Sequence, residues 1–348
     1  MNKLYKPQAA RIDNLNVLQT SSHCSFYELP KEEDISISRF LASTPESREI
    51  CNDPFLVGVN YTAALTKTCT AVLKAFQKKA PFELNEKHAT VLNILRGGLN
   101  FGLREALFNA FNWNEHASAF ISAQRARKSV GSEDWYISEN EYQKVYFSPQ
   151  SCLIFADVVA TGTSLAYALQ RVLSLARYEE KEIESILFLT IGGIKAEQLL
   201  LSADKYCREH FRTYSGAAVI YLEGRFDVAT SHSDLRIKIS GTDLLRKNAL
   251  LTPEFFNSQY DDPAFPLERC AIYDAGSRAF LVEEHYRDVL DYWRQTLALA
   301  NNGSTYEELL TERCPDLTPD RFKSPNLSDL CWRQVHRLQE RLKGCSES

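Results

Sequence analysis

The stretch "SCLIFADVVATGTSLAYAL", residues 151–169, changes character twice. An apolar run ends at Asp157, a turn of small and hydroxyl residues follows from Ala160 to Ser164, and apolar residues at helical spacing begin near Leu165. The pattern predicts a strand, a turn and a helix. Such a turn directs backbone N–H groups and hydroxyls to one point beside a helix N-terminus. The stretch therefore predicts an anion-binding turn.

The residue types in this turn suit a sugar phosphate. Gly162 lets the backbone approach an oxygen closely, while Thr161, Thr163 and Ser164 supply neutral donors for phosphate oxygens. Asp157 would repel a phosphate placed against it but suits the vicinal hydroxyls of an attached sugar. The stretch matches neither the G-x-x-x-x-G-K-[ST] loop nor G-x-G-x-x-G, so another kind of phosphate site is expected.

Strand-like and helix-like segments alternate on both sides of the turn. Strands are predicted at 89–95, 116–124, 183–193 and 216–224, and helices at 61–80, 99–113 and 194–211. The polar segment 125–143 predicts a mobile hairpin. This alternation predicts an α/β fold with a mainly parallel, twisted sheet flanked by helices.

Three regions are expected along the chain. Residues 1–55 mix polar and apolar positions without a sustained period and predict an N-terminal arm or partial cap, and residues 56–248 form the α/β core. Residues 249–348 carry helical patterns at 280–300 and 326–342, which predict an α-helical C-terminal subdomain.

Composition narrows the functional classes. The chain of 348 residues is 44% hydrophobic and 24% charged, a soluble globular balance, and its net charge of −5 argues against nucleic acid or anionic membranes as partners. No apolar run approaches the roughly 18 residues of a membrane span, and the N-terminus lacks the apolar segment of a secretory signal, so a cytoplasmic location is expected. The nine cysteines are scattered singly and predict neither a disulfide framework nor a metal cage.

A second glycine turn, "NILRGGLNFG" at 93–102, follows the predicted strand 89–95. Together, the two turns resemble those of type I phosphoribosyltransferases, over about residues 60–230. In that family the A-T-G-[TG]-[TS] loop holds the 5′-phosphate of phosphoribosyl pyrophosphate, and the preceding acids hold the ribose. The resemblance implies that Asp157 meets the ribose and that Arg96, with the amides of Gly97 and Gly98, holds the diphosphate.

The resemblance extends to the remaining site residues. It implies that Ala160 and the following turn bind substrate, and that Arg125, Arg127 and Lys128 belong to a mobile loop that closes over the diphosphate. A solvated charged surface is the alternative interpretation of these three cations. After the last core strand, Tyr221 and Phe226 are candidates to stack on an aromatic acceptor, although packing is the commoner role of aromatic residues. Glu223 and Asp227 either hold base N–H groups or face water.

Two positions depart from the family pattern. Most members have two adjacent acids at the strand end, whereas this chain has Ala156 before Asp157. Ala160 stands where purine-specific relatives often have an acid, so purine salvage is less favoured. The long additional segments favour a specialised acceptor.

The implied reaction transfers 5-phosphoribose from phosphoribosyl pyrophosphate to a nucleobase-like acceptor and releases pyrophosphate. Mg²⁺ is the implied cofactor, held by substrate oxygens without a dedicated protein metal site. A homodimer is expected. The alternative is a non-catalytic regulatory or assembly protein that binds phosphoribosyl pyrophosphate or a nucleotide, which the missing acid at Ala156 favours.

Overall fold

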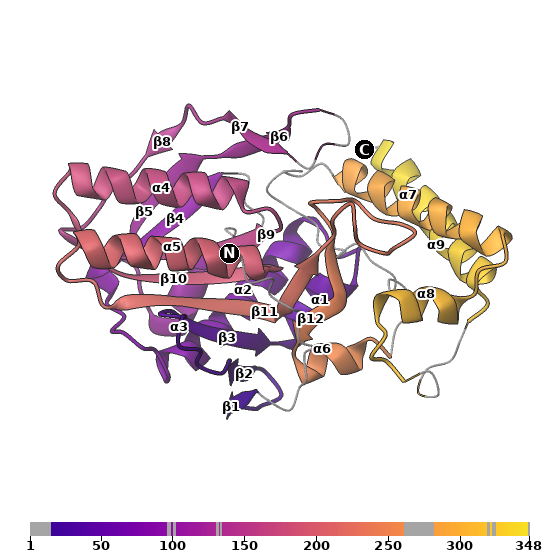
Figure 1. Ribbon diagram of the computed structural model, residues 1–348, viewed down its shortest axis with the longest axis horizontal. Helices are drawn as coiled ribbons and strands as arrows, with labels where there is room; N and C mark the ends of the chain where they lie inside the picture. The colour runs from indigo at the N-terminus through magenta and orange to yellow at the C-terminus, as the bar shows by residue number, and fades with distance from the viewer. Residues whose placement is uncertain are drawn as a thin grey trace.

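A large, mostly parallel sheet forms the centre of the computed structural model, which describes residues 15–95, 99, 102–129, 132, 134–260, 282–318, 321 and 325–346 (Figure 1). Its strands lie in the order β1-β2-β3-β11-β10-β9-β4-β5-β8, and β12 pairs with β11. The strands from β3 to β5 in this order are parallel to one another, whereas β1, β2, β8 and β12 pair antiparallel. The expected α/β class with a mainly parallel sheet is confirmed.

The strands are β1 (Asn16–Gln19), β2 (Ser25–Glu28), β3 (Ser38–Ser43), β4 (Ala89–Leu95), β5 (Ala117–Ser122), β6 (Gln124–Arg127), β7 (Trp135–Glu139), β8 (Gln143–Lys144), β9 (Gln150–Val159), β10 (Glu182–Gly193), β11 (Gly216–Val228) and β12 (Leu244–Leu251). The helices are α1 (Pro45–Asn52), α2 (Gly58–Gln77), α3 (Leu103–Phe111), α4 (Thr163–Tyr178), α5 (Ile194–His210), α6 (Pro253–Ser258), α7 (Val282–Asn301), α8 (Tyr306–Arg313) and α9 (Leu327–Ser346). A short 3₁₀ turn, η2 (Glu86–His88), precedes β4. The strands and helices predicted between residues 61 and 224 are all present, with small differences in their ends.

Helices cover both faces of the sheet, so its central strands are buried on both sides. Residues of α2 and α3 share one apolar cluster with Cys152 and Ile154 of β9. Residues of α4 and α5 share a second cluster with the alternate β9 residues Leu153 and Phe155. Figure 1 shows α4 and α5 side by side across one face. A strand buried on both faces has a continuous apolar sequence, which explains the apolar run that ends at Asp157.

Residues 16–52 belong to the sheet rather than to a separate arm. Strand β3 runs parallel to β11, with Ala218 opposite Ser38, and β2 and β1 extend this edge antiparallel. Helix α1 follows β3 and begins with a capping box between Thr44 and Ser47. The strands of this segment are short, and β3 pairs with a strand far away in the sequence. The segment therefore shows no sustained period, although it folds as part of the sheet.

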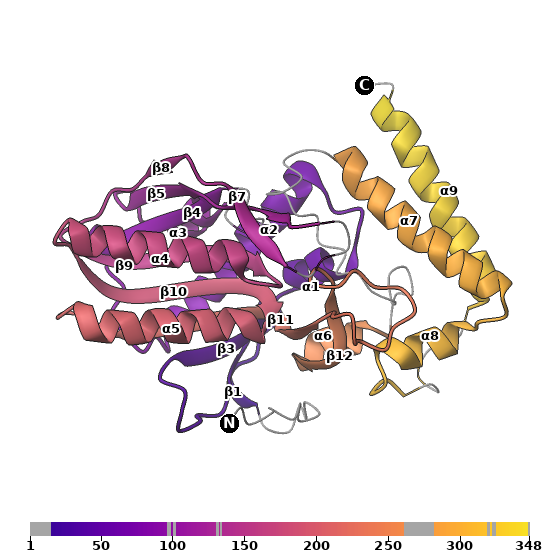
Figure 2. The same ribbon diagram turned by 45° about the horizontal axis from the view of Figure 1, so that its top comes forward.

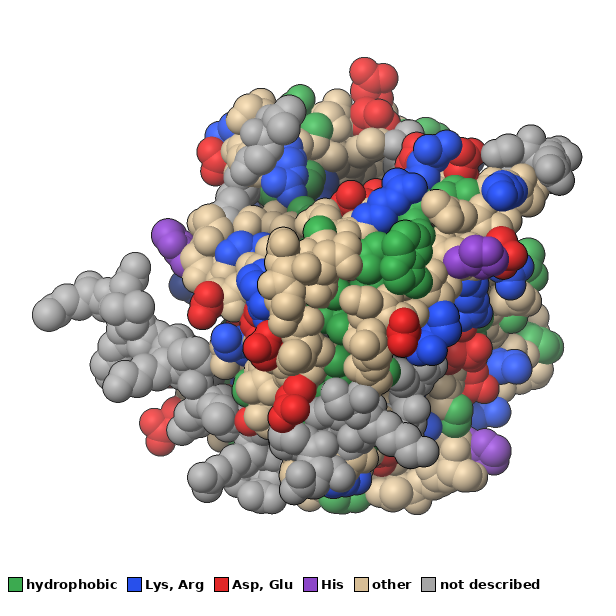
Figure 3. Space-filling view, turned by 90° about the vertical axis from the view of Figure 1, so that its right-hand side faces the viewer, with side chains coloured by type: hydrophobic (Ala, Val, Ile, Leu, Met, Phe, Trp, Pro, Cys, Tyr) green, Lys and Arg blue, Asp and Glu red, His purple; other side chains and the backbone are tan. Residues whose placement is uncertain are grey.

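The C-terminal region is helical, as expected, and has an apolar cluster of its own. Helices α7, α8 and α9 contribute Tyr292, Trp293, Leu309 and Leu338 to this cluster. Figure 2 shows α7 and α9 lying side by side beyond the sheet. The sequence predicted that the core would end at residue 248. Strand β12 runs across this position and pairs with β11, so the sheet extends beyond it. Figure 3 shows this end of the molecule, where hydrophobic side chains gather between basic and acidic ones.

Candidate functional site

The order of the parallel strands defines a switch point between β4 and β9. The chain moves outward from β4 through β5 to β8, then returns to β9 and moves the other way through β10 to β11. Ligands of open α/β sheets bind at such a point, outside the carboxyl ends of the strands. The pairing of these two strands ends at Val91 and Ile154, although β4 continues to Leu95 and β9 to Val159. The ends of β4 and β9 therefore mark the candidate site.

The turn after β9 leads directly into α4. Gly162 is the N-cap residue of α4, and no side chain caps this helix by a hydrogen bond. The hydroxyl oxygens of Thr161 and Thr163 lie 3.2 Å apart at this turn, and Ser164 follows in the first helical turn with a half-buried side chain. The first N–H groups of a helix have no acceptor within it, so an uncapped start presents donors to an anion.

Gly162 is required at this turn for two reasons. Its φ is +76°, in the left-handed region that favours glycine. A Cβ atom there would also lie 2.5 Å from Leu199 Cδ1 and 3.0 Å from Lys195 Cγ. The left-handed φ and the contact with α5 therefore explain this glycine. Ala160 is buried in the apolar core, so only its backbone could take part in binding.

The predicted hairpin forms from β6 and β7, which pair antiparallel. It brings Arg125 to the turn, where the guanidinium Nη1 donates a hydrogen bond to Thr161 Oγ1. Arg127 Nη2 instead donates to the Ser240 carbonyl at 2.9 Å. Lys128 is exposed and lies 3.4 Å from the exposed carboxylate of Asp134, as expected for a solvated surface pair. Among the described residues, Arg125 is therefore the predicted cation that contacts the turn after β9.

The second glycine segment follows β4 in the sequence. Arg96, Gly97 and Gly98 lie outside the described residues. The chain position of these residues is nevertheless clear, since β4 ends at Leu95 and α3 begins at Leu103. The segment thus connects the end of β4, on one side of the switch point, to a helix that covers the sheet.

Asp157 lies near the end of β9 with a side chain that is 6% exposed. Its Oδ1 accepts the backbone N–H of Val158 at 2.9 Å, and its carbonyl accepts the Thr190 hydroxyl at 2.8 Å. The preceding Ala156 is fully buried in the apolar cluster formed with α2 and α3. Its side chain faces the core, so an acid at this position would be placed among apolar groups.

The aromatic candidates after β10 are core residues. Phe226 is 2% exposed and its ring packs edge-on against Phe255, with 5.8 Å between centroids. Tyr221 is fully buried. Neither ring is exposed for stacking on an acceptor, and the packing interpretation holds for both. Asp227 is half-buried, and its Oδ1 accepts the Val228 N–H at 2.9 Å.

Glu223 neither faces water nor presents its carboxylate to an open site. It is fully buried and adopts a left-handed backbone with φ of +63°. Its carboxylate accepts hydrogen bonds from Ser43 Oγ at 2.7 Å, Thr252 Oγ1 at 3.1 Å and the Thr44 N–H at 3.2 Å, and from the Ser47 hydroxyl. Burial raises the pKa of Glu223 to about 7, against the hydroxyl donors, which lower it. This cluster joins β11 to β3, α1 and the start of α6.

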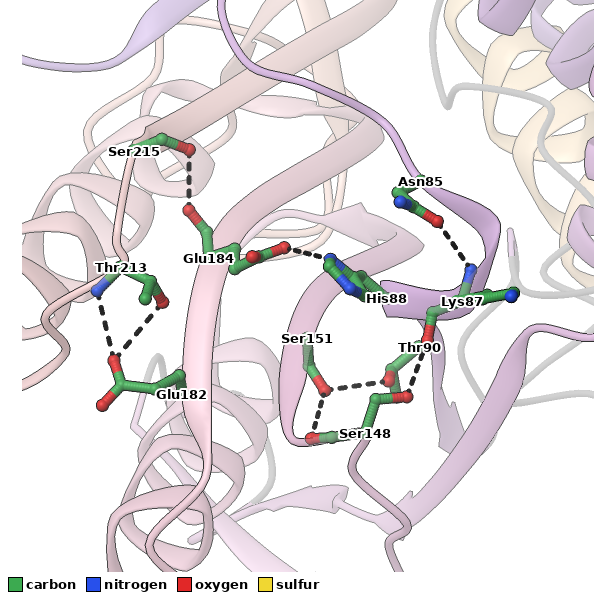
Figure 4. A network of polar contacts seen from close by, with 10 residues as sticks. All are labelled: Asn85, Lys87, His88, Thr90, Ser148, Ser151, Glu182, Glu184, Thr213 and Ser215. Carbon is green, nitrogen blue, oxygen red and sulfur yellow. Dashed lines mark hydrogen bonds and ion pairs between the residues drawn. The ribbon is translucent and has the colours of Figure 1, made fainter.

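A second polar network lies at the amino ends of the parallel strands, opposite the end that carries the candidate site. His88 Nδ1 lies 2.7 Å from Glu184 Oε2. Figure 4 shows this pair near the hydroxyl pair of Thr90 and Ser151. Glu182 and Ser215 continue this network towards the start of β11. Because ligands of α/β sheets bind at the carboxyl ends of the strands, this network is assigned to stability.

The described residues offer little to a metal ion on their own. No group of three or more His, Cys, Asp or Glu side chains in the described part of the chain could hold one. At the turn after β9, Asp157 is the candidate carboxylate. A Mg²⁺ ion bound there would need most of its ligands from another source, such as the oxygens of a phosphate substrate.

Comparison with known proteins gives no assignment: no family model matches the chain, and no curated protein matches it either. Among the helices within the described ranges, none combines the length and apolar character needed to cross a membrane.

Proposed function

We propose that this protein is a phosphoribosyltransferase, which transfers 5-phosphoribose from phosphoribosyl pyrophosphate to a nucleobase-like acceptor. The supporting observation is the switch point: the glycine segments at 96–98 and 160–164 follow β4 and β9, the two strands that flank it. The uncapped start of α4 and the Arg125 contact at Thr161 suit the 5′-phosphate. A specialised acceptor is favoured by the additional C-terminal helices.

In the proposed reaction, the bond between C1 of the ribose and the diphosphate oxygen breaks, and its electron pair leaves with pyrophosphate. A ring nitrogen of the acceptor supplies the electron pair for the new bond to C1, and an acceptor whose reacting nitrogen carries a proton releases it to solvent. The transition state resembles an oxocarbenium ion, so positioning and stabilisation of the leaving group supply most of the catalysis. Asp157 would orient the ribose hydroxyls, and Arg96 would bind the diphosphate. Mg²⁺ bound to the diphosphate would neutralise part of its charge.

The test is pyrophosphate release from phosphoribosyl pyrophosphate and Mg²⁺ in the presence of a panel of purine, pyrimidine and pyridine acceptors. We expect release with at least one acceptor, and a loss of about tenfold or more in kcat/KM when Thr161→Val removes a phosphate donor. Thr213→Val is the matched control, because Thr213 is exposed and bonds to Glu182 where the strands begin, away from the candidate site. Absence of release with every acceptor would refute catalysis.

A binding-only function is the second candidate, and the burial of Ala156 favours it. The described strand end carries the Asp157 carboxylate where most family members have two acids. For this function we expect calorimetric binding of phosphoribosyl pyrophosphate without pyrophosphate release. Restoring the missing acid is a poor test because position 156 faces the apolar core. Turnover with any acceptor would instead exclude the binding-only function.

A further inference from the structure

We propose that Trp135 is a positioning residue that holds Arg125 against Thr161. This inference deepens the proposed function, on which it rests for the identity of the turn as a phosphate site. The contacts themselves lie in β6, β7 and the turn after β9, and can be tested without a ligand.

Both hairpin arginines stack on one indole ring. Trp135 lies opposite Arg127 in the β6–β7 register, and Ile137 lies opposite Arg125. Arg125 and Arg127 are two residues apart on one strand, so their side chains share a face of the hairpin. The Cζ atom of Arg125 is 4.4 Å from the centroid of the Trp135 ring, and that of Arg127 is 4.6 Å away. Tryptophan is the strongest aromatic partner for a cation at such distances.

The far ends of the two arginines are fixed on different segments. Arg125 donates to the Thr161 hydroxyl. Arg127 donates to the Ser240 and Ser132 carbonyls, both at 2.9 Å. The indole therefore occupies the junction between the phosphate turn and the loop that leads into β12. An arginine held in this way loses less conformational freedom when it binds an anion, which is the advantage of pre-organisation.

The loop around Gly241 supports the same junction. Gly241 has a φ of +72°, and a Cβ atom there would lie 3.3 Å from Trp135 Nε1 and 3.4 Å from Thr161 Cγ2. Its backbone is thus packed against the indole and the turn together. Trp135 Nε1 is buried and makes no hydrogen bond among the described residues. The indole therefore acts through its ring face rather than through its N–H group.

Comparison of Trp135→Tyr with Trp135→Leu separates the contribution of the aromatic ring face from that of the indole N–H. Both substitutions remove the indole N–H, but tyrosine retains an aromatic face for Arg125 and leucine does not. The probe is ribose 5-phosphate, whose binding is measured by calorimetry. We expect Trp135→Leu to raise its Kd about three- to tenfold and Trp135→Tyr to change it less than about twofold. Trp332→Leu is the matched control, because Trp332 is 60% exposed on α9.

A double-variant cycle with Arg125→Gln separates positioning from packing. If Trp135 acts through Arg125, Trp135→Leu causes no further loss of affinity once Arg125 is replaced. Equal losses for the tyrosine and leucine variants, or an undiminished effect of Trp135→Leu in the Arg125→Gln background, would overturn the proposal.

The ligand-free protein supplies a second readout. The Nε–H NMR signal of Arg125 is assigned by its loss in Arg125→Gln, and we expect Trp135→Leu, but not Trp332→Leu, to shift it. If wild type fails to bind ribose 5-phosphate, the proposed phosphate site is wrong, while this signal still decides whether Trp135 positions Arg125. An Arg125 signal that Trp135→Leu leaves unmoved overturns the positioning role whether or not the sugar phosphate binds.

Discussion

Replacement of Glu223 by glutamine should remove a pH dependence from the stability of the fold. Glu223 is fully buried, and burial raises its pKa from an ordinary value of 4.5 to about 7. Between these values the folded protein retains a proton that the unfolded chain releases, so the free energy of unfolding falls as pH rises. Across this interval, the contribution of Glu223 to the free energy of unfolding falls by about 3 kcal/mol, and above about pH 7 it is lost.

Charged and titratable neighbours surround this carboxyl group. Arg48 of α1 lowers its pKa, and the Arg48 guanidinium donates a hydrogen bond to Ser43 at 2.6 Å. Burial raises the pKa values of Cys24 and Tyr27, and the charges of Glu223 and Glu254 raise them further. Glutamine keeps the size of the side chain and an oxygen that can accept hydrogen bonds, but it does not ionise.

The assay is urea unfolding of Glu223→Gln and wild type at about pH 4 and about pH 8.5, which bracket the interval. We expect the variant to gain up to about 3 kcal/mol relative to wild type between the two conditions. Glu209→Gln, at an exposed position of α5, is the control and should show no such gain. If the difference between Glu223→Gln and wild type is the same at both pH values, the reasoning from burial is wrong.

Three further substitutions test the packing of the site and its support. Gly162→Ala should lower the free energy of unfolding by about 2 kcal/mol or more, since a left-handed φ and a contact with α5 both oppose a Cβ; unchanged stability in urea would contradict this. Ala156→Asp should lower the free energy of unfolding by about 3 kcal/mol, because it buries a carboxylate, and it should not raise pyrophosphate release. Faster release would show that position 156 reaches the substrate. Glu197→Gln should lower the free energy of unfolding by about 3 kcal/mol, because the buried carboxylate pairs with Arg39 at 3.0 Å and Arg225 at 3.1 Å. Thermal unfolding measures this loss, and a shift in Tm below about 2 °C would contradict it.

Local patterns were sufficient for the part of the fold that surrounds the turn. The apolar run of β9, the glycine turn and the spacing of α4 each leave a periodic signature within a few residues. The strand edge formed by β1, β2 and β3 left no comparable signature. Its register depends on contacts such as Ala218 with Ser38, which are remote in the sequence. Short strands of this kind acquire their conformation from their neighbours in the sheet.

The residues of the candidate site also differ in whether the local sequence or remote contacts reveal their role. The residue types of the turn predicted an anion site, and Arg125 became a candidate because the family resemblance implies that it belongs to a loop closing over the diphosphate. Its contact with Thr161 and its stacking on Trp135 depend on how the hairpin folds over the turn. Trp135 itself carried no signal for a role at the site. A single aromatic residue in a polar segment can be placed only when its neighbours in space are known.

The sequence by itself determined the α/β class and the strand–turn–helix at residues 151–169, and it predicted an anion-binding turn there, because backbone periodicity and glycine turns are local properties. Only the tertiary structure decided that β4 and β9 flank a switch point, that Phe226 packs in the core, and that Glu223 is buried among hydroxyl groups. These outcomes depend on strand order and on what packs above each side chain. Neither is encoded in the spacing of neighbouring residues, since both arise from contacts between distant segments.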